Sequence, residues 1–113
     1  MINSYSFGRI TINGKVYTSD IIIFPDGSIQ DSWRRKEGHI LATLDIINLI
    51  EANPQLIIVG TGASNLMKVK NEIPEILRTK GIQLKILPTE QAIKLFNETY
   101  QNQKTGACFH LTC

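Results

Sequence analysis

The first third of the chain alternates short apolar runs with turn residues, which predicts β-strands. Asn13-Gly14 marks a hairpin, because a type I′ turn needs a positive φ at both of its central residues. The run Ile21–Phe24 is apolar on both faces and predicts a buried strand. Ile29–Trp33 is expected to pair back with it across the turn at Pro25–Ser28. An N-terminal β-hairpin region followed by a buried strand is therefore expected.

After this region the hydrophobic period alternates between that of a helix and that of a strand. The segment 56–87 reads as a strand-helix-strand unit, whose crossover should be right-handed. Together these features predict a single α/β domain over residues 1–113, with a central mixed β-sheet, flanking helices and an N-terminal β-hairpin layer as three layers. The predicted helices are capped by Thr43, Asn71 and Thr89, and the predicted strands cover Leu56–Val59, Ile82–Ile86 and Ala107–Thr112.

Composition narrows the class of protein. A length of 113 residues fits one domain, and a hydrophobic content of 42% fits a globular one. The net charge of +2 is too small for a dedicated nucleic-acid binder, so no nucleic-acid partner is expected. No apolar run approaches the roughly 20 residues of a membrane span, and Met1–Arg9 carries no targeting pattern. We expect a cytoplasmic protein.

A loop with two glycines follows the predicted strand Leu56–Val59. Its backbone N–H groups and hydroxyls are typical of a small anion site, although a plain crossover turn has the same composition. A nucleotide is disfavoured, because the third glycine of the dinucleotide fingerprint and the Gly-Lys-Ser/Thr of a P-loop are both absent. The candidate ligand loop consists of Gly60, Thr61, Gly62, Ala63, Ser64 and Asn65.

A cluster of basic residues with one aromatic side chain follows the hairpin region. Such a cluster predicts a surface for a protein partner or an anion, and a solvated surface is the alternative. A histidine in this segment could act as a general acid or base, or simply bond within its loop. The candidate surface consists of Trp33, Arg34, Arg35, Lys36 and His39.

Both cysteines lie in the last six residues, on either side of a histidine. The spacing of Cys108, His110 and Cys113 matches no standard zinc site, so no metal is expected. Five residues of extended strand would separate the two cysteine Cα atoms by roughly 16 Å, too far for a disulfide. His110 and Cys113 remain additional candidates. Ser64 followed by His110 does not make a hydrolase in a chain this small, and no catalytic residue is assigned.

Several short segments, spread over nearly the whole chain, form a recognisable set: Tyr5–Ile10, Ile22–Pro25, Trp33–His39, Val59–Ala63, Leu66–Met67 and His110–Cys113. Together they resemble the Mth-type domain family, which contains the adipogenesis-associated Mth-domain proteins and the mitochondrial complex I assembly factor three. The resemblance implies an α/β fold with a central mixed sheet and a flanking strand layer. It also implies a protein partner, because the mitochondrial members of the family act as assembly chaperones.

The favoured function is a non-enzymatic binding or assembly-factor-like module that acts through a protein partner and needs no cofactor. The alternative is a small-anion-binding protein, or an unrecognised enzyme, that uses the loop Gly60–Asn65.

Overall fold

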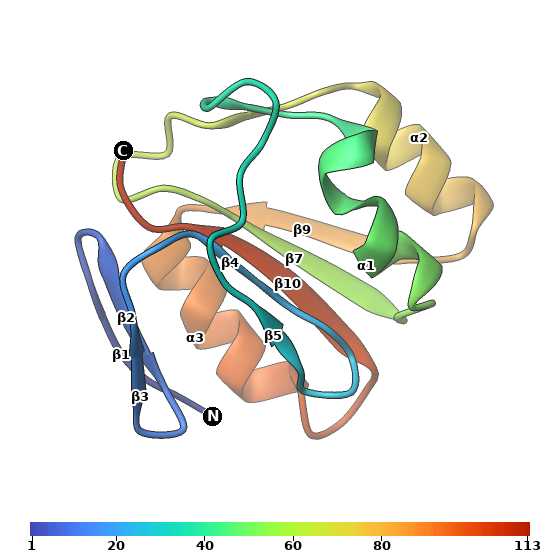
Figure 1. Ribbon diagram of the computed structural model, residues 1–113. Coiled ribbons are helices and arrows are strands. Elements are labelled where there is room, and N and C mark those ends of the chain that lie inside the picture. Colours follow the sequence, from blue (N-terminus) through green and yellow to red (C-terminus); the bar gives the residue numbers. More distant parts are fainter.

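The computed structural model describes residues 1–113 and places a five-stranded mixed sheet between two covering layers (Figure 1). The strand order in this sheet is β5-β4-β10-β7-β9. The strands are β1 (Ile2–Ser6), β2 (Arg9–Ile12), β3 (Lys15–Tyr17), β4 (Ile21–Ile23), β5 (Ile29–Gln30), β6 (Ile40–Leu41), β7 (Leu56–Thr61), β8 (Lys68–Val69), β9 (Gln83–Leu87) and β10 (Thr105–His110). The helices are the 3₁₀ turn η1 (Thr43–Ile46), α1 (Ile47–Glu51), α2 (Glu72–Thr79) and α3 (Thr89–Thr99).

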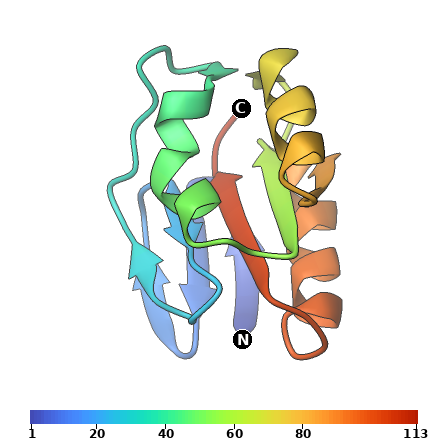
Figure 2. The ribbon, with the colours of Figure 1, turned by 90° about the vertical axis from the view of Figure 1, so that its right-hand side faces the viewer.

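Strand β10 lies in the middle of the sheet, although it is the last strand of the chain. It runs parallel to β7 and antiparallel to β4, and Figure 2 shows β10 and β7 side by side, ending at the same edge. Every residue of β10, β7 and β4 is buried. The double-sided apolar runs Ile21–Phe24 and Leu56–Val59 are thus confirmed as central strands, although Phe24 lies beyond the end of β4.

Successive side chains along these strands point to opposite faces of the sheet, so the protein has two separate hydrophobic cores. Phe109 and Ile58 point to one face of the sheet, where α3 and the β1-β2-β3 meander pack. Cys108 and Ile57 point to the other face, where η1, α1 and α2 pack. The three-layer prediction is confirmed, with the hairpin layer enlarged to three strands by β1, whose polar outward residues gave a weak strand pattern.

The two helical crossovers run in opposite directions across the sheet. The chain passes from β7 through α2 to β9, and then returns through α3 to β10 on the other side of β7. Because such crossovers are right-handed, opposite directions place α2 and α3 on opposite faces, as Figure 1 shows. Because β7, β9 and β10 are parallel, their carboxyl ends lie at the same end of the sheet, which we call its carboxyl edge. None of the helices has the length and apolarity needed to cross a bilayer.

The predicted helix caps at Thr43 and Thr89 are wrong. Each is the first residue inside its helix, after Ala42 and Pro88. The buried Thr89 hydroxyl instead accepts a bond from the Gly62 N–H at 2.8 Å and donates one to the His110 carbonyl at 2.6 Å. A tertiary partner that is remote in sequence has thus replaced the local cap.

Three further expectations are corrected. Asn71 precedes α2, but its side chain makes no capping hydrogen bond. The strand expected at Ile29–Trp33 ends at Gln30, because Trp33 turns away into the core on the helical side. The strand expected at Ile82–Ile86 is β9, Gln83–Leu87, and its Ile86 is 42% exposed because β9 is the outermost strand of the sheet.

We predict that Gly62→Ala destabilises the protein more than Gly14→Ala. Both glycines have a positive φ, +108° and +83° respectively. A Cβ at Gly62 would also overlap the main chain of Cys113, whereas a Cβ at Gly14 would meet nothing. The expected losses are about 2–3 kcal/mol for Gly62→Ala and about 1 kcal/mol for Gly14→Ala. Urea denaturation checks them, and equal losses would contradict the close approach of residue 113.

Candidate functional site

The carboxylate of Asp20 joins three segments at the carboxyl edge of the sheet. Asp20 directly precedes β4, and its Oδ2 lies 2.8 Å from Arg35 Nη2 and 2.8 Å from His110 Nδ1. Its Oδ1 accepts a hydrogen bond of 2.8 Å from the Leu111 N–H. An ionised carboxylate only accepts hydrogen bonds, so the short contact places a proton on Nδ1 of His110.

These contacts determine the protonation of Asp20. Burial alone would raise its pKa, but the hydrogen bonds from His110, the Leu111 N–H and Arg35 outweigh burial and leave the pKa below its ordinary value. The side chain is 14% exposed. Asp20 is therefore a stable anion whose partners are all provided by the protein itself.

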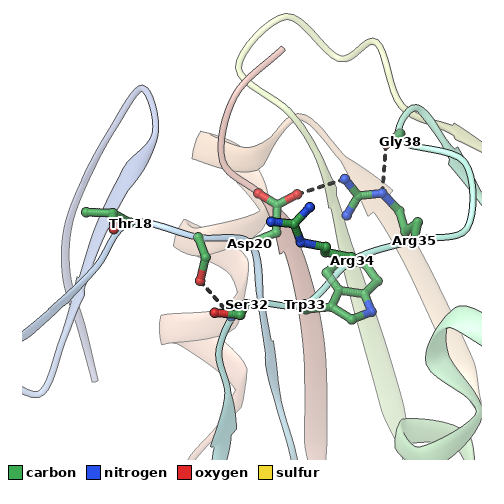
Figure 3. Close-up of a pocket in the computed structure, with 8 residues that line it drawn as sticks. Thr18, Asp20, Ser32, Trp33, Arg34, Arg35 and Gly38 are labelled. Carbon is green, nitrogen blue, oxygen red and sulfur yellow. Dashed lines mark hydrogen bonds and ion pairs between the residues drawn. The ribbon is translucent and has the colours of Figure 1, made fainter.

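Arg35 is held on several sides. Its side chain is only 5% exposed, and its Nε donates a 2.8 Å bond to the Gly38 carbonyl (Figure 3). Its Cζ lies 4.7 Å from the centre of the Trp33 ring, within the range of a cation–π interaction. The indole N–H of Trp33 in turn donates to the Asp45 carbonyl at 2.9 Å. After these contacts Nη1 of Arg35 is buried without a hydrogen-bond partner.

His110 is the third member of this Asp20 cluster. The ring is buried, and its Nε2 has no hydrogen-bond partner. The exposed His39 ring lies 5.7 Å away at 73°, an edge-to-face arrangement. His39 thus packs beside an imidazole that a carboxylate already orients.

A pocket of about 430 Å³ opens beside the Asp20 cluster (Figure 3). Its wall includes the Ser32 backbone at a φ of +51°, a conformation that L-residues seldom adopt. The Ser32 N–H donates to the Ser19 Oγ at 2.7 Å, which holds the two sides of the pocket together. We call this the arginine pocket; it is lined by Thr18, Ser19, Asp20, Ser32, Trp33, Arg34, Arg35 and Gly38.

The structure divides the candidate surface into exposed and buried residues. Arg34, Lys36 and His39 are exposed as expected. Trp33 and Arg35 are not part of an exposed surface: the indole packs in the core, and the guanidinium pairs with Asp20. They form part of the wall of the arginine pocket.

The glycine loop does not offer a free anion site. The Ala63 N–H donates to the Thr112 carbonyl at 2.6 Å, and the N–H groups of Ser64 and Leu66 donate to the Cys113 oxygen at 3.1 and 3.2 Å. These backbone donors are thus occupied by the chain's own residues 112–113. Gly60 and Thr61 belong to strand β7, the Thr61 hydroxyl contacts the Asn65 side chain, and the Gly62 N–H is taken by Thr89.

The two cysteines differ in environment. Cys108 is fully buried, and burial raises the pKa of its thiol to about 12. Cys113 is half-buried. No three histidine, cysteine, aspartate or glutamate side chains lie close enough together to bind a metal ion.

Sequence reasoning missed Asp20, the centre of the cluster. Its only signal was a carboxylate immediately before a double-sided apolar run, which is also typical of a turn. Its partners lie 15 and 90 residues away, so no local pattern joins them. The sequence likewise offers no reason to group Lys68 and Lys70 with the basic segment that begins at Arg34. They lie near it because β8 pairs with β6, and these two-residue strands are too short to show a strand pattern in the sequence.

We predict that Asp20→Asn costs about 3–5 kcal/mol of unfolding free energy near neutral pH, because it leaves Arg35 buried without its counter-charge. The native pKa of Asp20 lies below its ordinary 3.8, so the stabilisation is complete above that value and is lost as the pH falls through the native pKa. The difference from wild type should therefore shrink in acid. Urea titrations across the pH range measure it, with exposed Asp31→Asn as control; a difference that stays constant into acid would contradict the ionic role.

We also predict that the native protein reacts with one equivalent of iodoacetamide at mildly alkaline pH. The thiolate is the reactive form, and Cys108 is both buried and protonated under these conditions. Mass spectrometry should find the label on Cys113, and Cys113→Ser should remain unlabelled until denaturant is added. Equal labelling of both residues in the native state would show that the core opens readily at β10.

The same fold is found in several solved structures of other proteins. The conserved hypothetical protein PH1505 from Pyrococcus horikoshii OT3 is 26% identical, with a TM-score of 0.90 and coverage of 100% of this chain and 99% of that one. The protein MT938 is 30% identical in sequence, and its structure matches with a TM-score of 0.84 over 100% of this chain and 98% of that one.

A more distant structure, a Mth938-like domain from Bordetella pertussis, shares the fold at 15% identity, with a TM-score of 0.64 and coverage of 98% and 85%. A family model described as a protein of unknown function (DUF498/DUF598) matches residues 2–110. The chain therefore belongs to the DUF498/DUF598 family of proteins of unknown function, with the Mth-type domain that its sequence resembles.

Proposed function

We propose that this protein is a non-enzymatic binding module that docks an acidic segment of a protein partner, with the cytoplasm as its expected compartment. The docking surface is a set of four exposed cations beside the Asp20 cluster. We call it the basic strip: Arg34, Lys36, Lys68 and Lys70.

The pairing of β6 with β8 brings the two segments of the basic strip, residues 34–36 and 68–70, close together in space. Lys68 pairs with Ile40 in β6, and its N–H donates to the His39 carbonyl at 2.8 Å. Lys36 and Lys70 line one small hollow. Arg34 lies two residues before Lys36 and lines the arginine pocket. Cations that are more than 30 residues apart in sequence thus share one side of the molecule.

The strip carries an excess of positive charge and none of its cations is held in an ion pair. Glu37 and Asp45 line the hollow of Lys36 and Lys70, and the Asp45 carboxylate accepts the backbone N–H of Lys36. The ion pairs of the structure join Asp20 to Arg35 and to His110, and Glu75 to Arg78, so no strip cation has a carboxylate within ion-pair distance. The nearby Glu72 accepts hydrogen bonds from Thr43. This unpaired positive charge is the observation that carries the proposal, because complementary charge guides and orients protein partners.

The Asp20 cluster supports binding rather than catalysis. The Asp20 oxygens are hydrogen-bonded, His110 Nδ1 is engaged, and His110 Nε2 is buried without contact to a hydroxyl or thiol. A general base must reach the proton that it removes. The cluster thus acts as a rigid support beneath the strip. The resemblance to an assembly factor with a protein partner favours the same function.

We predict that a fluorescently labelled hexaglutamate peptide binds the protein, and that its affinity decreases with added salt. Lys68→Glu with Lys70→Glu should weaken binding at least about tenfold at low salt, or roughly 1.4 kcal/mol. Fluorescence anisotropy measures the affinity.

A charge-matched control is the pair Lys94→Glu and Lys104→Glu. Both residues are exposed; Lys94 lies on α3, on the opposite face of the sheet, and Lys104 precedes β10 at the opposite edge. This control should change the affinity much less. If it weakens binding as strongly as the strip variant, only net charge matters and the proposed surface is wrong.

A further inference from the structure

The arginine pocket adjoins the basic strip at Arg34, and the geometry points to a role in that contact. We propose that the pocket receives one carboxylate side chain of the acidic segment and anchors it. This inference rests on the proposed function, and it adds the site at which the partner is fixed and the chemical group that is fixed there.

The free charge in the pocket is positive. Of the three charged side chains in its wall, Asp20 and Arg35 form an ion pair at 2.8 Å and compensate each other. Arg34 has no counter-ion and is exposed. Figure 3 shows Arg34 and Arg35 side by side along the segment that follows Trp33, with only the guanidinium of Arg35 joined to Asp20. The unpaired guanidinium of Arg34 therefore favours an anionic ligand in the pocket.

Two residues of the same wall, Arg35 and Ser19, have hydrogen-bond donors without an acceptor. Nη1 of Arg35 belongs to a side chain that is only 5% exposed and has no partner. An unpaired buried donor is unfavourable, so an acceptor brought to it by the usual side-chain adjustments of binding recovers free energy. Ser19 Oγ already accepts the Ser32 N–H, and its own hydrogen remains available to a ligand.

The shape of the pocket favours a carboxylate on a side chain over a free ion. A volume of about 430 Å³ is much larger than a single small ion and lies in the range of sites for small organic groups. The planar fork of a guanidinium also matches the two oxygens of a carboxylate. A glutamate that enters the pocket would leave its neighbours over the basic strip.

The pocket contains its own reporter. Trp33 is the only tryptophan of the chain, and its ring contacts the Arg35 guanidinium in the pocket wall. Binding of an anion beside Arg35 should change the emission of Trp33. The experiment titrates the protein with hexaglutamate, with glutarate as a small free dicarboxylate and with inorganic phosphate, and it follows both Trp33 emission and the anisotropy of the labelled peptide.

A matched pair of variants blocks the pocket without touching the strip. Thr18 is exposed and lines the pocket opposite the basic segment. Thr18→Glu places a competing carboxylate there, and Thr18→Gln is its neutral control of the same size. We expect Thr18→Glu to weaken peptide binding about tenfold and to abolish the Trp33 response, whereas Thr18→Gln retains both. Thermal denaturation confirms that both variants fold.

The outcomes separate the two proposals. If the peptide binds by anisotropy while Trp33 emission is unchanged and Thr18→Glu binds like Thr18→Gln, the pocket is not the anchor, and the basic strip alone stands. If glutarate changes Trp33 emission but hexaglutamate binds no more tightly and the Lys68/Lys70 variant has no effect, the proposed function fails and the carboxylate site stands. If phosphate displaces the peptide at lower concentration than glutarate, the carboxylate assignment is overturned.

Discussion

The Asp20 carboxylate is the point at which the carboxyl edge of this molecule is held together. It lies before β4, and it binds the Arg35 side chain in the loop after β5 and the His110 side chain and the Leu111 N–H at the end of β10. A largely buried charge of this kind is unfavourable unless its partners are fixed in place. Here the partners are themselves fixed, Arg35 by Gly38 and Trp33 and His110 by its place in β10. The position of the arginine pocket follows from this one network.

Much of the fold follows from local pattern, because burial imposes its period on the sequence. Runs that are apolar on both faces became β4 and β7, and the Asn13-Gly14 turn became the β2–β3 hairpin with positive φ at both residues. Local pattern fails where a tertiary partner competes. Thr89 has the side chain of a cap, but it bonds to Gly62 and His110, which the sheet brings to it from remote parts of the chain.

The candidate site was harder to predict than the fold, for a related reason. The basic segment was recognised from its charge, yet charge alone does not reveal which arginine is buried. Arg34 and Arg35 are neighbours, and only the second reaches Asp20. The glycine loop had the composition of an anion site, but its donors bind residues 112–113. Composition identifies the groups that are able to bind, and only the tertiary arrangement shows which of them are already bound.

The central position of β10 has a consequence for how the protein is made. Strands β4 and β5 lie on one side of it and β7 and β9 on the other, so the two halves of the sheet have no direct hydrogen bonds between them. They cannot join until residues 105–110 have been synthesised, and until then β4 and β7 each present an unpaired edge of isoleucine-rich strand. Closure of the sheet must therefore wait for β10, which follows all the other strands of the sheet along the chain. For a domain with this topology, the nascent chain exposes the most unpaired strand edge before β10 appears.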